Sequence, residues 1–265
     1  MRYTCFVRED PQSQKCYEEL SAHLNQAGWI KDDTDPQLVI TIGGDGTVLS
    51  AIHQYINNLT TCTFTGINTG SLGFFSDYKI TEMDLFKRDL LGKQPTFTAK
   101  RMIQAKIDDD EAQVFYALNE IRVESHIKTT IIQIDIDNYP LELICGNGLC
   151  ISSQAGSTAY NRSLGGAILD EDLNGGVGLQ LTEILPVHNS SFRSLKSSFV
   201  LAENRKITIY DKSLGGNFSN SVLCYDNLYT DLQGKSKISI NLGDIVVKFS
   251  HYKNIAYLER IKTLF

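Results

Sequence analysis

The chain has 265 residues, of which 42% are hydrophobic and 21% charged, so it can bury the core of one large domain or of two. Its net charge is −6 and its pI is about 5.4, without the basic stripe that a nucleic-acid partner requires. The apolar runs are shorter than the ~20 residues of a membrane-spanning helix. Because the N-terminus also lacks a signal-peptide core, we expect a cytoplasmic protein with no membrane contact.

The first third of the chain alternates between strand and helix patterns. Apolar residues predict a helix over 13–27, with Gly28 at its C′ position. Strands are predicted at 2–8, 38–42 and 62–67, and a second helix at 80–90 is followed by Gly92. Such alternation is typical of an α/β domain with an open, doubly wound sheet, which we place at residues 1–97.

Beyond Pro95, short strand patterns separated by Gly, Asn and Asp turns predict a β-rich, sandwich-like domain over residues 98–250. The predicted strands are 96–108, 113–124, 130–137, 141–150, 177–182, 199–202, 206–210, 221–224, 228–232, 237–240 and 245–249. The last segment, residues 251–265, has the apolar spacing of a short amphipathic helix that packs back on the body.

The cysteines and histidines indicate neither a disulfide framework nor a metal site. No two cysteines form a C-x-x-C pair, and most lie in apolar surroundings, so we expect buried free thiols. The five histidines have no metal-ligand spacing.

The stretch Gly43–Thr47 follows the strand at 38–42 and opens into a helical pattern at 48–56, which Thr47 could cap. Its glycines Gly43, Gly44 and Gly46 would let a phosphate approach the backbone at a helix N-terminus. Because a carboxylate repels phosphate, Asp45 should face a magnesium ion or a hydroxyl awaiting deprotonation. The simpler alternative is a tight turn, for which two glycines would suffice.

A second stretch, residues 66–77, contains three glycines and a Phe–Phe pair after the strand at 62–67. It is therefore expected at the same sheet edge as Asp45, where open α/β sheets bind ligands.

A third stretch, Asn119–Glu120, lies inside a predicted strand over 114–123, so the two side chains should point to opposite faces. A fourth, residues 146–166, is rich in Gly, Ser and Thr and suggests a short helix from about Ser157. Each stretch could also be an ordinary loop, strand face or capped helix.

These four stretches, in this order, closely resemble the NAD kinase family. They are Gly43–Gly44–Asp45–Gly46–Thr47, Asn68–Thr69–Gly70–Ser71–Leu72–Gly73–Phe74, Asn119–Glu120 and Gly156–Ser157–Thr158–Ala159–Tyr160. The first stretch alone is shared with diacylglycerol-type lipid kinases, and a close variant occurs in phosphofructokinases. The other three separate the sequence from both.

The resemblance implies phosphorylation of the adenosine ribose 2′-hydroxyl of NAD by ATP, which gives NADP. It implies that Asp45 accepts the hydroxyl proton and that Mg²⁺ binds through the ATP phosphates, which the loop residues Gly43, Gly44, Gly46 and Thr47 would contact. The residues implied in NAD binding are Asp45, Gly46, Phe74, Asn119, Glu120, Cys145, Asn147, Thr158, Ala159, Tyr160 and Ser163. Family members are homodimers or homotetramers that share the NAD site between subunits, with the C-terminal segment returning to the first domain.

The chain departs from the family pattern near the nicotinamide end of this site. The family usually has Asp at the position of Asn147 and a basic residue at that of Cys145. An amide at Asn147 can pair with a carboxamide but carries no charge, which leaves the preference between NAD and NADH open. Two other functions stay open as well: a kinase of this motif class that acts on a lipid or sugar, and a nucleotide sensor without turnover. The phosphoryl donor could be ATP or polyphosphate.

Overall fold

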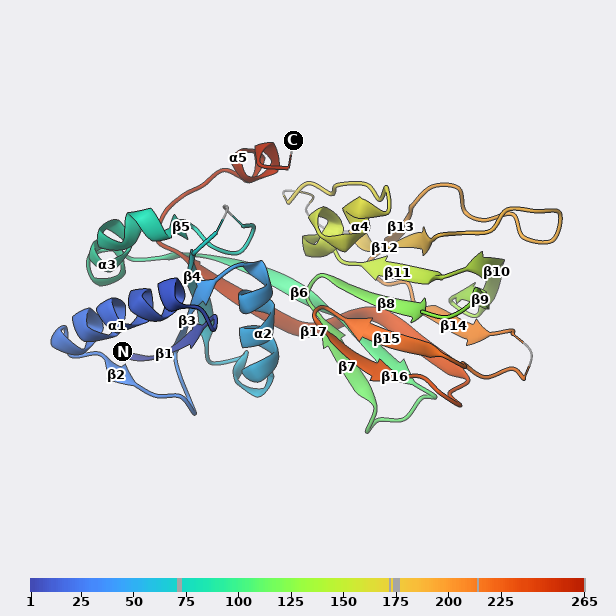
Figure 1. The fold of residues 1–265 in the computed structure, drawn as a ribbon, viewed down its shortest axis with the longest axis horizontal. Coiled ribbons are helices and arrows are strands. Elements are labelled where there is room, and N and C mark those ends of the chain that lie inside the picture. The colour runs from blue at the N-terminus through green and yellow to red at the C-terminus, as the bar shows by residue number, and fades with distance from the viewer. Residues whose placement is uncertain (71–72, 172, 174–176, 214, 265) are drawn as a thin grey trace. The chain divides into compact units, whose positions relative to one another are not determined.

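The computed structural model describes residues 1–70, 73–171, 173, 177–213 and 215–264. The chain forms two compact units: unit 1 comprises Met1–Lys100 and Val246–Phe265, and unit 2 comprises Arg101–Ile245. Two strands, β6 (Thr96–Ile107) and β17 (Lys237–His251), contribute residues to both units (Figure 1). Ser71 and Leu72 of the second glycine-rich stretch, and Phe265 of the C-terminal pattern, lie outside the described residues.

Unit 1 contains a parallel sheet with the strand order β2–β1–β3–β4. Its strands are β1 (Arg2–Val7), β2 (Ile30–Lys31), β3 (Leu38–Gly43), β4 (Thr63–Asn68) and the short β5 (Tyr78–Lys79). The end of β17 pairs with β4, also in parallel. Every residue of β3 is buried, as expected for a central strand covered on both faces.

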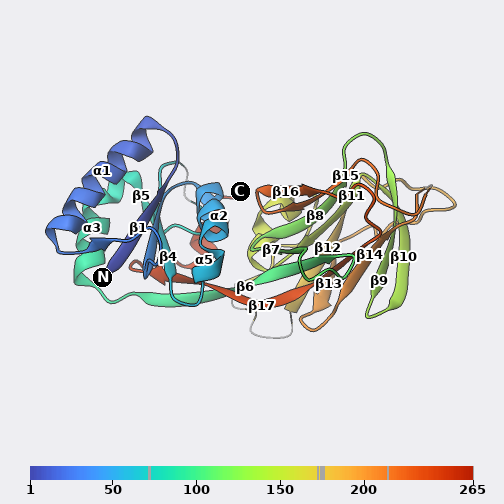
Figure 2. The same ribbon diagram turned by 90° about the horizontal axis from the view of Figure 1, so that it is seen from below.

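Helices cover both faces of this sheet, with α1 (Pro11–Gln26) and α3 (Met83–Gly92) on one face and α2 (Asp45–Gln54) on the other (Figure 2). The carboxylate of Asp10 caps α1, and Gly28 ends it with a φ of 78°, as predicted. The ring of Tyr3 on β1 meets the edge of Trp29 at 6.0 Å between centroids. The 3₁₀ turns are η1 (Ile56–Asn58) and η2 (Ile80–Glu82), and α5 (Tyr257–Lys262) lies near the C-terminus.

Unit 2 is a sandwich of two sheets. One sheet has the order β13–β12–β11–β8–β15–β16, and the other contains β10–β9–β14–β17, with β6 beside β17 and β7 beside β6. The strands are β7 (Val114–Ala117), β8 (Glu120–Ser125), β9 (Thr130–Ile136), β10 (Tyr139–Gly146), β11 (Gly148–Ser152), β12 (Val177–Ile184), β13 (Phe199–Ala202), β14 (Ile207–Asp211), β15 (Ser221–Tyr225) and β16 (Leu228–Asp231).

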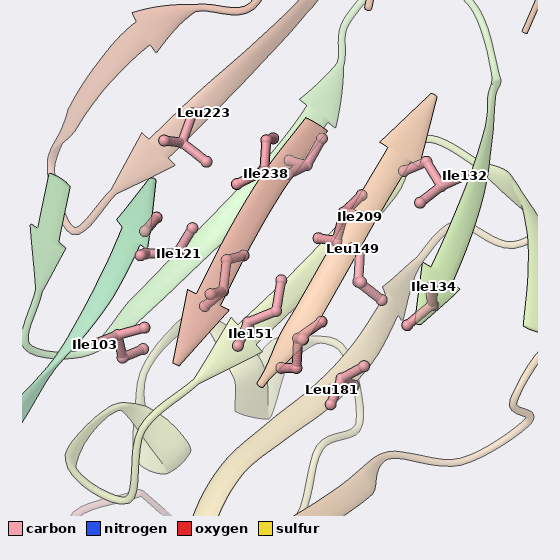
Figure 3. Close-up of a cluster of buried hydrophobic side chains, with 14 of the residues drawn as sticks. Ile103, Ile121, Ile132, Ile134, Leu149, Ile151, Leu181, Ile209, Leu223 and Ile238 are labelled. Carbon is pink, nitrogen blue, oxygen red and sulfur yellow. The ribbon is translucent and has the colours of Figure 1, made fainter. Parts of the chain in front are cut away.

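The two sheets share one apolar core, in which Ile121, Leu149 and Leu223 face Ile134 and Ile209 of the opposite sheet (Figure 3). Both parts of the predicted fold class, the α/β domain and the β-rich domain, are therefore confirmed. All six cysteines are free thiols, and within the described residues no helix has the length and apolar character to cross a membrane.

Five details of the predicted elements are wrong. Helix α2 begins at Asp45 with Gly44 as its N-cap, so Thr47 lies inside the first turn and does not cap it. The predicted strand over 113–124 is two strands in different sheets, with Asn119 in the break. The predicted strand over 141–150 breaks at Asn147, whereas 237–240 and 245–249 join in one strand, β17. The helix expected from Ser157 is a 3₁₀ turn, η3 (Ala155–Thr158), followed by the four-residue α4 (Tyr160–Ser163).

Candidate active site

The Gly43–Thr47 loop lies at the carboxyl edge of the unit 1 sheet, where Gly43 of β3 stands opposite Asn68 of β4. A Cβ on Gly43 would come within 2.2 Å of the Thr47 hydroxyl oxygen, so the turn requires glycine there. By contrast, a Cβ on Gly44 or Gly46 would meet nothing within 4 Å. The backbone of this turn therefore faces open space at the N-terminus of α2, as a phosphate cradle would.

The carboxylate of Asp45 is held by two backbone amides from the second glycine-rich stretch. The Phe74 N–H donates to Oδ2 at 2.9 Å, and the Phe75 N–H donates to Oδ1 at 3.3 Å. A Cβ on Gly73 would come within 2.1 Å of Oδ1, so this close approach also depends on glycine. The two stretches that the sequence singled out separately thus meet at Asp45.

Burial raises the pKa of Asp45, while the two amide hydrogen bonds and the charge of Arg260 act to lower it. The net shift is upward, which makes this carboxylate a stronger base than an exposed aspartate. The loop that supplies the amides is fixed by aromatic contacts. Phe75 stacks on Phe249 at 5.4 Å between ring centroids, and Phe74 meets the edge of Tyr257 at 6.4 Å.

Two residues that the sequence patterns did not single out, Arg260 and His251, support this loop. Arg260 of α5 is 5% exposed and donates to the carbonyl oxygens of Gly73 and Ser76 at 3.1 and 2.8 Å. It also pairs with the buried carboxylate of Asp77, which His251 Nδ1 contacts at 2.9 Å. No local signal could have identified Arg260, because its partners lie more than 180 positions earlier in the chain.

In unit 2, the break between β7 and β8 exposes backbone groups that Asp226 binds. Its carboxylate accepts from the amides of Leu118 and Asn119 at 2.8 and 2.7 Å. The Asn119 carbonyl accepts from the Ser153 amide at 2.9 Å, and a Cβ on Gly156 would come within 2.0 Å of the same carbonyl oxygen. The structure thus brings Asn119 and the 153–156 turn into direct contact.

Glu120, Arg122 and Glu124 alternate along β8 and share its polar face. The Arg122 guanidinium donates to Glu120 Oε1 at 2.9 Å and to Glu124 Oε1 at 2.7 Å. It also lies 4.2 Å from the centroid of the Tyr160 ring, which is the geometry of a cation–π contact. Burial raises the pKa of Glu120 to about 7, although the charge of Arg122 acts to lower it.

Asn119 Oδ1 and Glu120 Oε2 are among the nine buried side-chain polar atoms that lack a partner within the described residues, and they are adjacent in the chain. Their side chains are 7% and 5% exposed. An unpaired buried acceptor is costly unless a ligand or water satisfies it, so these atoms mark a candidate ligand contact. The sequence pattern predicted both residues inside one strand. In the structure Asn119 lies in the break between β7 and β8, whereas Glu120 is the first residue of β8.

The remaining predicted NAD-binding residues of unit 2 fall into two groups. Thr158 and Ala159 are half-buried, and Tyr160 and Ser163 are exposed, all at the end of β11 that adjoins Asn119. Asn147 and Cys145 precede β11 at its opposite end, about 17 Å away along the strand. Asn147 donates its side-chain amide to the Ser125 carbonyl at 3.4 Å. The structure therefore separates these two residues from the Asn119 group.

Among the described residues, no three His, Cys, Asp or Glu side chains converge as metal ligands. The Asp45 carboxylate is engaged by the Phe74 and Phe75 amides instead. A divalent cation beside Asp45 would therefore need a bound ligand to supply most of the oxygens that coordinate it.

Comparison with known proteins places these features in a family. Residues 7–90 match the family model described as the ATP-NAD kinase N-terminal domain. NAD kinases of Streptococcus pneumoniae, from strains Hungary19A-6 and R6 among others, are 38% identical over 210 residues. That alignment covers 78% of this chain and 76% of each relative.

Two solved structures have a similar fold. Yeast NADH kinase, crystallised with NADH, superimposes with a TM-score of 0.81 at 18% identity, covering 99% of this chain and 86% of its own. An NAD kinase from Archaeoglobus fulgidus, in complex with ATP, gives a TM-score of 0.71 at 20% identity, covering 100% of this chain and 97% of its own.

Proposed function

The chain belongs to the NAD kinase family, and we propose that Asp45 is the general base in its phosphorylation of NAD by ATP, which gives NADP. One observation supports this role above all: a partly buried carboxylate with a raised pKa begins a helix beside an open glycine-rich backbone. Such a carboxylate can take a proton from a hydroxyl while the adjacent amides bind phosphate oxygens.

In the proposed step, the 2′-oxygen of the adenosine ribose attacks the terminal phosphorus of ATP, and its proton passes to Asp45. The bond between that phosphorus and the bridging oxygen breaks, and ADP leaves. Gly43, Gly44, Gly46 and Thr47 form the phosphate-binding turn, in which positioning and charge stabilisation supply most of the catalysis. A divalent cation carried on the ATP phosphates would neutralise charge that builds up between donor and acceptor.

For NAD binding, we assign the adenosine half to Phe74, Asn119 and Glu120. The unpartnered acceptors Asn119 Oδ1 and Glu120 Oε2 support this, because an adenine amino group and a ribose hydroxyl are hydrogen-bond donors. Further dinucleotide contacts are assigned to Gly46, which adjoins the general base Asp45, and to the segment beside Asn119. That segment contributes Thr158, Ala159, Tyr160 and Ser163.

Cys145 and Asn147 are assigned to the nicotinamide half of an NAD molecule bound by a neighbouring subunit. Their position at the far end of β11 from Asn119 supports the nicotinamide assignment, since one adenosine could not contact both ends. The neighbouring subunit is taken from the sharing of the NAD site that the family resemblance implies. The protein is accordingly proposed to be a homodimer or homotetramer.

The test of the base is Asp45→Asn, assayed for NADP formation from NAD, ATP and Mg²⁺. An amide cannot accept the proton, so kcat should fall by about 10²–10⁴-fold. The matched control is Asp84→Asn, which removes an exposed carboxylate from α3 of the same unit and should leave kcat unchanged. Near-normal turnover of the Asp45 variant would rule out the assigned role.

A further inference from the structure

One peptide unit connects the buried guanidinium of α5 with the carboxylate of Asp45. The carbonyl oxygen of the Gly73–Phe74 peptide accepts from Arg260 Nη1 at 3.1 Å, and the N–H of the same peptide donates to Asp45 Oδ2 at 2.9 Å. Because the peptide is planar, fixing its oxygen also fixes the direction of its N–H. A cation at the oxygen also polarises the N–H, since linked hydrogen bonds strengthen one another.

We infer that Arg260 is a positioning residue for Asp45, acting through the Gly73–Phe74 peptide that both side chains bind. This inference rests on the proposed function, in which Asp45 is the general base. Arg260 does not touch the reacting atoms; it sets the orientation of the carboxylate that accepts the proton.

Nη1 of Arg260 binds the loop on both sides of the two amides that donate to Asp45. Nη1 binds the carbonyls of Gly73 and Ser76, and between them lie Phe74 and Phe75, whose amides hold the two oxygens of Asp45. A lysine ammonium, with a single nitrogen on a flexible stem, lacks the rigid fork that lets Arg260 bind these carbonyls and Asp77 together.

Arg260 is itself held by a chain of contacts that begins at Asp77. Its Nη2 pairs with Asp77 Oδ1, and Asp77 is 2% exposed. His251 Nδ1 lies 2.9 Å from Asp77 Oδ2, and Thr98 Oγ1 lies 2.8 Å from His251 Nε2. Together these contacts form a chain of hydrogen bonds behind the loop, in which every member has a fixed partner.

The charge of Arg260 acts to lower the pKa of Asp45, against the effect of burial. The other titratable groups in this chain of contacts are Asp77, which pairs with Arg260, and His251, which contacts Asp77. Removing the cation should therefore raise the pKa of Asp45 and move the acidic limb of the kcat–pH profile to higher pH. Arg260→Lys, which keeps the charge, should shift it much less.

The first test compares Arg260→Met, Arg260→Lys and the exposed control Arg88→Met in unit 1, each also combined with Asp45→Asn. With Asp45 present, Arg260→Met should lower kcat by up to about 10²-fold, as expected for a displaced catalytic group, and Arg260→Lys by less. In the Asp45→Asn background neither change should cost more activity, because the residue it positions is gone. If Arg260→Met does not fold, the smaller loss of kcat in Arg260→Lys, measured with and without Asp45, tests the same dependence on Asp45.

The second test follows the carboxyl ¹³C resonance of Asp45 during a pH titration, which needs no enzymatic activity. A higher pKa in Arg260→Met than in the wild type is expected. An unchanged Asp45 titration, or an equal loss of kcat with and without Asp45, would overturn the inference and leave Arg260 with a purely structural role. If Asp45→Asn alone stays active, the proposed base is wrong, and the titration still decides whether Arg260 acts on Asp45.

Discussion

Replacing Glu120 with glutamine should stabilise the protein at high pH and leave it unchanged at low pH. Burial raises the pKa of Glu120 from 4.5 to about 7. Between these values the unfolded chain has released the proton and the folded chain retains it, so folding takes up a proton. Stability contributed by this side chain therefore falls as the pH rises from about 4.5 to about 7. Glutamine has nearly the same shape and never ionises.

The size of the effect follows from the same two values. The difference between them corresponds to about 3 kcal/mol in the free energy of unfolding, at 1.36 kcal/mol per pH unit. Near pH 4, protonated Glu120 and glutamine are both neutral, so wild type and Glu120→Gln should be equally stable. Near pH 8 the variant should be more stable by up to about 3 kcal/mol, with Arg122 still paired to Glu124.

Urea unfolding followed by circular dichroism, repeated between about pH 4 and pH 8, measures this difference. The control is Glu111→Gln, which removes one negative charge from an exposed position of the same unit and so corrects for the change in net charge. Two parallel curves for wild type and Glu120→Gln, with no divergence as the pH rises, would refute burial of the Glu120 carboxylate as the cause of the raised pKa.

Four further substitutions probe features of both units. Gly43→Ala should lower the free energy of unfolding by about 1–3 kcal/mol through its clash with Thr47, whereas Gly44→Ala should leave stability unchanged and raise the KM for ATP. Asp226→Asn should cost about 1–3 kcal/mol, measured in urea, because an amide oxygen cannot replace a carboxylate that accepts two backbone amides. Asn147→Asp should raise the kcat/KM ratio of NAD over NADH by up to about fivefold, since only oxidised nicotinamide is cationic; an unchanged ratio would place Asn147 away from that ring.

The sequence predicted those features of the fold that depend on local patterns. The stripe of apolar residues on α1 and the positive φ of Gly28 follow from neighbouring residues alone. The same holds for β3, whose continuous apolar run indicates burial on both faces. The meeting of the two glycine-rich loops followed from a topological rule, because both loops leave parallel strands at the same edge.

Features that depend on distant partners could not be predicted in this way. The strand break at Asn119 is held by Asp226, 107 positions further along the chain, so the local pattern indicated one strand. The contacts of Arg260 with the Asp45 loop likewise join opposite ends of the sequence. At Thr47 the residue type favoured a cap, but Gly44 precedes the first helical residue and takes that place.

The edge contact between Trp29 and Tyr3 gives the protein an optical reporter confined to one unit. Trp29 is the single tryptophan of the chain and lies in unit 1, beside β1. Its fluorescence therefore follows the loss of the α/β sheet, whereas circular dichroism also records the strands of the sandwich. Coincident transitions from the two signals would show that both units unfold together, and separate ones would give each unit its own stability.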